Sequence, residues 1–156
     1  MKLADFNAKL GLIVEQSLKS RDDSSCCGCC INKSTIQASY GSPPYMSPEL
    51  FNNEKKCLLP CSMTQSELLE AIDIWAIGVT LFVMITGAFP WQRAELSDPH
   101  YAKYVEQRLG TISASKCTSV WSCFNLSPDV TDLLVHMLEP NLSLRWSLAR
   151  VSTHPW

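Results

Sequence analysis

The chain has 156 residues, of which 46% are hydrophobic and 18% are charged. This length and this balance suit one globular domain with a core of its own. The 13 Lys and Arg residues stand against 15 Asp and Glu residues, a formal net charge of −2. With no basic excess to neutralise phosphates, we expect no nucleic-acid partner. The N-terminus has no apolar segment of the secretory kind, so we expect a cytoplasmic protein.

The chain contains eight cysteines, four of which lie within residues 26–30. In a cytoplasmic protein the default is reduced thiols. The C-x₃-C spacing of Cys57 and Cys61 could pair with the first group to ligate zinc. A polar loop with incidental cysteines explains the pattern as well, and we expect no zinc.

The first part of the chain has few regular elements. Residues 1–6 are apolar and predict a short strand that leads into a turn. Residues 16–40 are rich in Ser, Asp, Lys and Cys without an apolar period, so they predict a long flexible loop. A loop of this length is unusual inside a domain unless it is functional. Pro43 and Pro44 predict a rigid turn, and residues 52–61 predict a second loop.

A long apolar helix follows. Thr64 and Glu67 form the pattern of a capping box, and that helix, or a second one directly after it, runs through residues 71–86. Gly87 and Pro90 end it. It is apolar on nearly all faces, which predicts a place at the centre of the fold. Residues 74–92 carry no charge, so a membrane span is the alternative. The interruptions by Gly, Thr and Pro favour a core helix, and we expect no membrane.

The last part of the chain predicts three further helices. One starts at Ser97 and continues to about Arg108, and residues 110–125 are irregular. Ser127 followed by Pro128 starts the next. Its apolar residues form one stripe: Val130, Leu133, Leu134, Met137 and Leu138. Ser147 is predicted to cap a last short helix that ends near His154. The predicted fold is therefore mainly α.

Four motifs occur in a fixed order along the chain. They are Asp5-Phe6-Asn7, Ser47-Pro48-Glu49, the segment from Asp73 to Gly78 with Trp75 at its centre, and Arg145. This series resembles the D-F-G, A-P-E, D-x-W-x-x-G and closing-Arg motifs of eukaryotic protein kinases. The resemblance implies the C-terminal part of the kinase large lobe. Residues 1–156 would be a partial kinase domain, with an activation segment at 1–50 that includes loop 16–40, and a helical core at 51–156. A short strand remnant would stand at its N-terminus.

The resemblance assigns roles to several residues. Asp5 would bind Mg²⁺ and, through it, the phosphates of ATP. Asn7 stands where the family has glycine, and Asn is the side-chain-bearing residue that best tolerates positive φ. Residues 41–49 are similar to the substrate-docking loop of serine/threonine kinases, with Ser42, Pro43 and Tyr45 in that loop.

The same resemblance predicts the structural contacts. Glu49 would pair with Arg145 in a bidentate contact. Asp73, Trp75 and Gly78 would lie in the central helix. In the family, the aspartate of this motif accepts backbone N–H bonds from a catalytic loop that this sequence does not contain. Asp73 would then be a buried carboxylate without donors, at a cost of about 2–7 kcal/mol.

Regulation would act on the activation segment. Ser39, Thr35 and Ser34 are the nearest hydroxyls to the Gly41 turn, and an upstream kinase could phosphorylate them. Phosphate there could order the loop against an arginine. Unmodified loop hydroxyls are the open alternative.

The implied function is transfer of the ATP γ-phosphate to Ser or Thr of a protein substrate. Residues 87–91 and the closing His154-Pro155-Trp156 look most like the calmodulin-dependent kinase-like group. The glycine-rich loop, the nucleotide lysine and the catalytic aspartate are missing, so we expect the chain alone to be an inactive fragment, from a truncated gene model. The alternative is a short pseudokinase-like module that docks a partner on its central helices. The substrate, the activator and the role of the cysteine cluster stay open.

Overall fold

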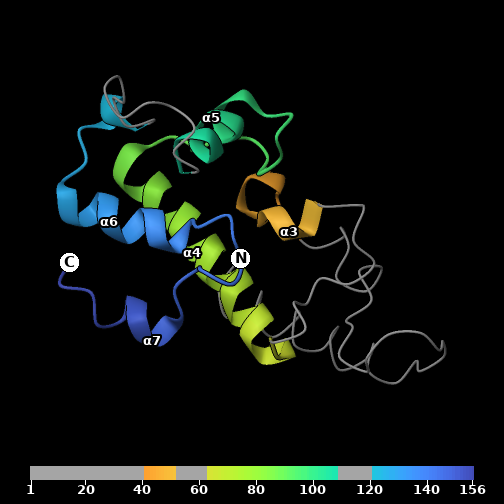
Figure 1. The fold of residues 1–156 in the computed structure, drawn as a ribbon. Coiled ribbons are helices and arrows are strands. Elements are labelled where there is room, and N and C mark those ends of the chain that lie inside the picture. Colours follow the sequence, from red (N-terminus) through yellow and green to blue (C-terminus); the bar gives the residue numbers. More distant parts are fainter. Residues whose placement is uncertain (1–40, 52–62, 109–120) are drawn as a thin grey trace.

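The computed structural model describes residues 41–51, 63–108 and 121–156 (Figure 1). Several predictions lie outside these residues: Asp5 and the strand at 1–6, the loop at 16–40 with Ser34, Thr35 and Ser39, and the whole loop at 52–61. The described residues form helices and turns without a strand, so the prediction of a mainly α fold is confirmed for this part of the chain.

Seven elements follow one another in the described residues. Two are single 3₁₀ turns, η1 and η3, and five are α-helices, of which α4 is the longest. Their bounds are η1 Pro43–Tyr45, α3 Pro48–Phe51, α4 Gln65–Thr86, α5 Pro99–Arg108, η3 Ser122–Phe124, α6 Pro128–Met137 and α7 Leu148–Val151. Helix α4 runs through the middle of the molecule, and both α6 and η1 pack on it (Figure 1).

Helix α4 is one continuous helix with a fixed start and a fixed end. The Thr64 hydroxyl accepts a bond from the N–H of Glu67 at 3.3 Å, and the Glu67 carboxylate accepts the N–H of Thr64 at 2.7 Å. The N–H and the hydroxyl of Thr64, which both donate to the Glu67 carboxylate, lower the pKa of Glu67. Gly87 ends the helix with φ of 72°, a conformation that favours glycine. The two-helix alternative for residues 64–86 is therefore excluded.

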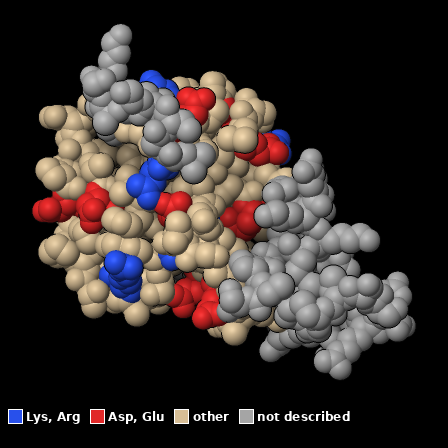
Figure 2. All heavy atoms as spheres, viewed as in Figure 1, with Lys and Arg blue, Asp and Glu red and all other residues tan. Residues whose placement is uncertain are grey.

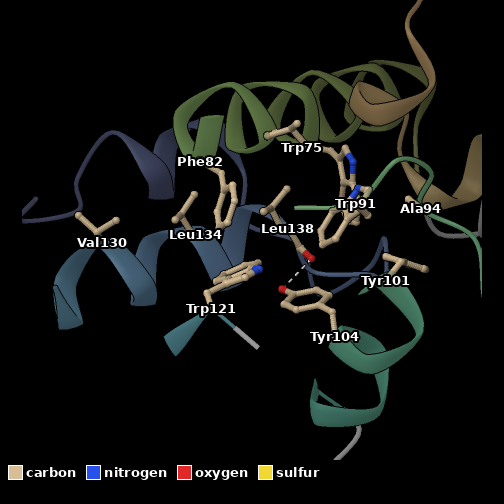
Figure 3. Close-up of a cluster of buried hydrophobic side chains, with 11 residues drawn as sticks. Trp75, Phe82, Trp91, Ala94, Tyr101, Tyr104, Trp121, Val130, Leu134 and Leu138 are labelled. Carbon is tan, nitrogen blue, oxygen red and sulfur yellow. Dashed lines mark hydrogen bonds between the residues drawn. The ribbon is translucent and has the colours of Figure 1, made fainter. Parts of the chain in front are cut away.

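The main core is built from aromatic rings around α4 and α6 (Figure 3). Trp121 lies between Phe82 and Tyr104, with ring centroids 5.1 and 5.0 Å away. The Tyr104 hydroxyl donates to the carbonyl of Leu138 at 3.0 Å, so its polar end is satisfied inside the core. Burial raises the pKa of Tyr104. The aromatic rings thereby tie α5 and the segment at Trp121 to the two central helices.

Helix α7 differs from the prediction in two respects. Ser147 makes no capping bond with its side chain. Instead Glu70 of α4 accepts the N–H of Leu148 at 2.7 Å. The helix also ends at Val151, and the N–H groups of Thr153 and His154 then bond only three residues back, to the carbonyls of Arg150 and Val151. A carboxylate from a distant helix therefore replaces the expected local cap.

Helix α4 is long and apolar enough to cross a membrane by length and composition, and 44% of its most apolar window is buried inside the protein. Its buried residues pack on α6 and the aromatic core, which supports the interpretation as a core helix. On the face drawn in Figure 2, the Lys and Arg side chains of the described residues lie apart from one another and form no continuous basic patch.

Candidate functional site

A bidentate ion pair joins two segments that are far apart in the sequence. Arg145 Nη1 and Nη2 donate to the two carboxylate oxygens of Glu49, both at 2.9 Å, across a separation of 96 residues. The Arg145 side chain is 0% exposed and that of Glu49 is 11% exposed. Two parallel bonds to a planar guanidinium fix orientation as well as distance. Helix α3 is therefore held in one position against the rest of the domain.

Arg145 makes further contacts that complete its environment. Its Nη1 also donates to the carbonyl of Ala71 at 2.8 Å, and its Nε donates to the carbonyl of Glu139 at 3.0 Å. The guanidinium lies over the Trp75 ring at 4.8 Å. A buried charge is tolerated when its hydrogen-bonding groups are satisfied in this way. One side chain thus holds α3, α4 and the segment after α6 together.

A second ion pair joins α5 to the segment after α6. It was not anticipated from the sequence. Arg108 of α5 pairs with Glu139, whose other oxygen accepts the N–H of Asn141 at 3.0 Å. Burial opposes the charge on Arg108, but the hydrogen bond to Glu139 raises its pKa. Neither residue belongs to one of the four motifs, and the two are 31 positions apart. No local pattern in the sequence marks such a pair.

The segment that precedes α3 is short and rigid. The carbonyl of Ser42 accepts the N–H of Tyr45 at 3.0 Å, which closes η1, and prolines occupy its first two positions. Ser42 and Pro43 are exposed, while Tyr45 is half-buried. The Tyr45 ring meets Phe89 edge to face, with centroids 5.4 Å apart. The predicted docking residues Ser42, Pro43 and Tyr45 therefore lie together at the surface.

The loop that carries Phe89 is held by one carboxylate. Asp98 accepts the N–H groups of Gln92 and Arg93 at 2.9 and 3.2 Å, and those of His100 and Tyr101 at 2.9 and 3.2 Å. Partial burial opposes ionisation, but the four backbone donors together lower the pKa of Asp98. The sequence indicated only a helix start at Ser97-Asp98-Pro99. The bonds to Gln92 and Arg93 depend on the path of the loop.

Helix α4 presents two opposite faces. Asp73, Ile77, Thr80 and Met84 share one side at i, i+4, i+7 and i+11. Ile77 is 38% exposed and Met84 is 78% exposed. We call these four residues the open stripe. Within the described residues no hydrogen bond or ion pair reaches the Asp73 carboxylate, and burial raises its pKa.

Trp75 and Gly78 lie on the other face of α4. Trp75 is fully buried against Trp91 and Tyr101, with ring centroids 5.5 and 6.3 Å away. A Cβ atom at Gly78 would lie 3.0 Å from Leu138 Cδ2 and 3.1 Å from Met137 Cβ. The close approach of α4 and α6 therefore depends on the missing side chain.

The described residues contain no cluster of side chains suited to a metal ion. No group of three or more His, Cys, Asp or Glu side chains in residues 41–51, 63–108 and 121–156 could hold a metal ion. The predicted magnesium ligand Asp5 lies outside them. Two of the three histidines have other contacts: His136 stacks on Trp146 at 3.9 Å, and His154 Nε2 lies 3.3 Å from Asp132 Oδ2.

Comparison with known proteins identifies the family. Residues 15–156 match the protein kinase domain. The chain is 30% identical over 116 residues to the serine/threonine-protein kinase CHK1 of Saccharomyces cerevisiae, across 74% of this chain and 19% of that protein. It is 31% identical to the serine/threonine-protein kinase GRIK2 of Arabidopsis thaliana, across 100% of this chain and 29% of that protein.

A third relative gives the same result. The serine/threonine-protein kinase stk11 homolog of Dictyostelium discoideum is 28% identical across 100% of this chain and 20% of that protein. The chain thus spans less than a third of the length of these relatives. The domain match covers more than half of the chain, and the three relatives are serine/threonine kinases. The chain therefore belongs to the protein kinase family.

Proposed function

We propose that this chain acts as the C-terminal part of an ATP-dependent protein serine/threonine kinase. In that reaction the bond between the γ-phosphorus and its bridging oxygen breaks, ADP leaves, and the phosphorus bonds to the hydroxyl oxygen of the substrate. The hydroxyl proton needs a base that the described residues do not supply. The observation that carries the proposal is the exposed Ser42–Tyr45 turn, held against the domain by the pair of Glu49 and Arg145.

The remaining roles follow the family. Asp5 would hold Mg²⁺, which neutralises the phosphates of ATP when both are bound. Protein substrates would dock at Ser42, Pro43 and Tyr45, and an upstream kinase would act on Ser39, Thr35 or Ser34. We place the protein in the cytoplasm, without a membrane or nucleic-acid partner.

We also propose membership of the calmodulin-dependent kinase-like group. The support is the segment at 87–91, which leads from the Gly87 turn to the buried Trp91, and the closing His154-Pro155-Trp156. A peptide-array profile of the active enzyme, compared with profiles from that group and from other serine/threonine kinases, tests this placement.

We propose that these 156 residues alone do not catalyse. The support is the sequence of residues 1–156, which contains no glycine-rich loop, nucleotide lysine or catalytic-loop motif. In addition, no hydrogen bond reaches the Asp73 carboxylate within the described residues. The test is calorimetry of the purified chain with Mg-ATP, together with transfer of ³²P from labelled ATP to casein. We expect neither binding nor transfer, and tight Mg-ATP binding would contradict the proposal.

The kinase function is tested on the transcript. Its 5′ region is sequenced for an in-frame H-R-D-x-x-x-x-N motif within about twenty codons upstream of Met1. If the motif is present, the extended protein is expressed and assayed. We expect phosphate transfer to Ser or Thr, lost in Asp5→Asn. No transfer by the extended protein would overturn the proposal.

A non-catalytic binding module is the second candidate. The observation that favours it is the open stripe of α4, which leaves Ile77 and Met84 accessible. Stop codons in all frames upstream of Met1 would support the module and contradict the kinase.

A further inference from the structure

A cluster of aromatic and titratable side chains joins α6 to the segment after α7. The chain turns back toward α6 there, and His154 Nε2 lies 3.3 Å from Asp132 Oδ2 (Figure 1). The His154 side chain is 7% exposed, whereas that of Asp132 is 54% exposed. The N–H of His154 donates to the carbonyl of Val151 at 3.2 Å. His154 is therefore fixed to α7 by its backbone and to α6 by its ring.

The contacts of the His154 ring decide which of its nitrogens carries the proton. A carboxylate oxygen only accepts, so the Nε2 atom that faces Asp132 is protonated. A backbone N–H only donates, and that of Trp156 lies 3.2 Å from Nδ1, so Nδ1 is unprotonated. The two contacts together require the neutral Nε2–H form of the ring. A second proton would have to bind at Nδ1, the atom that accepts the Trp156 bond.

His136 lies one turn further along α6 and uses its ring differently. Its Nδ1 lies 2.8 Å from the carbonyl of Asp132, which only accepts, so this nitrogen carries the proton. The ring also stacks on that of Trp146, with centroids 3.9 Å apart. Neither the hydrogen bond nor the stacking needs an unprotonated Nε2. His136 can therefore gain a second proton without losing either contact, whereas His154 cannot.

The charged and titratable groups beside His154 come from both helices. Asp132 and His136 face it from α6, with His136 Nδ1 3.7 Å from Asp132 Oδ1. Arg150 of α7 lies over the Trp146 ring, whose centroid is 5.9 Å from that of His154. Asp132 is the one acid among these groups and would still attract the His154 ring after protonation. The added charge would therefore leave the ring on α6 and change only its contact with Trp156.

We propose that His154 is a pH-sensitive switch for the backbone at Trp156. In the neutral ring, Nδ1 accepts the Trp156 N–H and holds this residue beside the cluster. When the pH falls and Nδ1 gains a proton, two N–H groups face each other, so the bond breaks and Trp156 is released. The bond from Nε2 to Asp132 remains. The pH thereby controls the path of the chain at Trp156, a property that lies beyond the proposed kinase function.

The test is an NMR titration of the ¹⁵N-labelled 156-residue chain from about pH 8 to about pH 5, the range in which histidine changes charge. Long-range ¹⁵N–¹H spectra of the imidazole rings report which nitrogen is protonated. At the upper pH the His154 ring should show the Nε2–H form. The Trp156 amide should then exchange with solvent about two- to tenfold more slowly than an unbonded amide, as one hydrogen bond would give. This protection should disappear with the same midpoint as the His154 ring.

Two variants separate the roles of the histidines. His154→Gln removes the titrating ring and keeps a side-chain amide that can donate to Asp132. In this variant the protection of the Trp156 amide should no longer change with pH. His136→Gln is the matched control, because it removes the other imidazole beside Asp132. The pH response of Trp156 should persist in it.

Three results would overturn the proposal: an Nδ1–H form of His154 at pH 8, a Trp156 amide whose protection does not follow the His154 ring, or a pH response that persists in His154→Gln. The first two are measured on the unchanged chain, so they decide the matter even where a variant does not fold. An extended protein that transfers no phosphate would contradict the proposed function alone and would leave these results as they are.

Discussion

The two faces of α4 are made from similar residues but have different surroundings. On one face Leu68, Trp75, Val79 and Phe82 are fully buried. On the other, the open stripe exposes Ile77 and Met84 and leaves the Asp73 carboxylate without a donor within the described residues. Apolar composition alone therefore does not show whether a helix face packs inside this chain or is available to bind another polypeptide. Substitutions on each face measure the difference.

The largest effect is expected from Arg145→Met, because Arg145 packs on the buried face of α4 at Trp75 and Ala71. This change leaves the Glu49 carboxylate buried without its partner and removes the bonds to two carbonyls. Breaking a buried pair from one side costs about 3–5 kcal/mol in the free energy of unfolding. Urea denaturation followed by circular dichroism measures it. The control is Arg150→Met, whose guanidinium lies over Trp146 at the surface. A loss in Arg145→Met no larger than in this control would contradict the structure.

A smaller loss is expected from Gly78→Ala. At an exposed position of a helix, replacing Gly with Ala stabilises the helix by up to about 1 kcal/mol. Here the new Cβ would lie 3.0–3.1 Å from atoms of Leu138 and Met137, so these neighbours must move by a few tenths of an ångström. Overpacking of this kind costs about 1–3 kcal/mol. The sign of the change in unfolding free energy is the readout, and Ile77→Ala on the opposite face is the comparison, with a small effect.

Asp73→Asn should change stability in the other direction. Burial raises the folded-state pKa of Asp73, so its ionisation destabilises the fold. This destabilisation is absent at low pH. It develops as the pH rises from the unfolded-state pKa of about 3.9 through the folded-state pKa, and it is complete above the folded-state pKa. The amide removes the cost, so Tm at pH 7 should rise modestly and the two proteins should converge near pH 3. Asp129→Asn, at an exposed carboxylate in the first turn of α6, should bring no such gain.

The smallest effect is expected from Met84→Ser on the open stripe. Met84 is 78% exposed, so its side chain contributes little to the fold of this chain. The change in unfolding free energy should stay within about 0.5 kcal/mol. A loss of about 2 kcal/mol or more would show that this face is covered, and the contrast between the two faces would fail.

Local patterns predicted the elements well, and ordered motifs predicted one distant contact. The Thr64 cap and the apolar stripe of α6 follow from residues three and four positions apart. Glu49 and Arg145 were paired through the resemblance to a family, since nothing local connects them. The bond from Leu148 to Glu70, the pair of Arg108 with Glu139 and the contact of Tyr45 with Phe89 had no such guide. They depend on how the helices pack, which periodicity does not encode.

The contact between Glu49 and Arg145 has a consequence for synthesis. Chains emerge from the ribosome with the N-terminal part first. Glu49 therefore emerges long before Arg145, which lies 96 residues later in the chain. Until Arg145 has emerged, Glu49 lacks the partner that fixes α3. We expect nascent chains stalled before Arg145 to be cleaved readily by protease near residues 42–46, and chains that include α7 to resist.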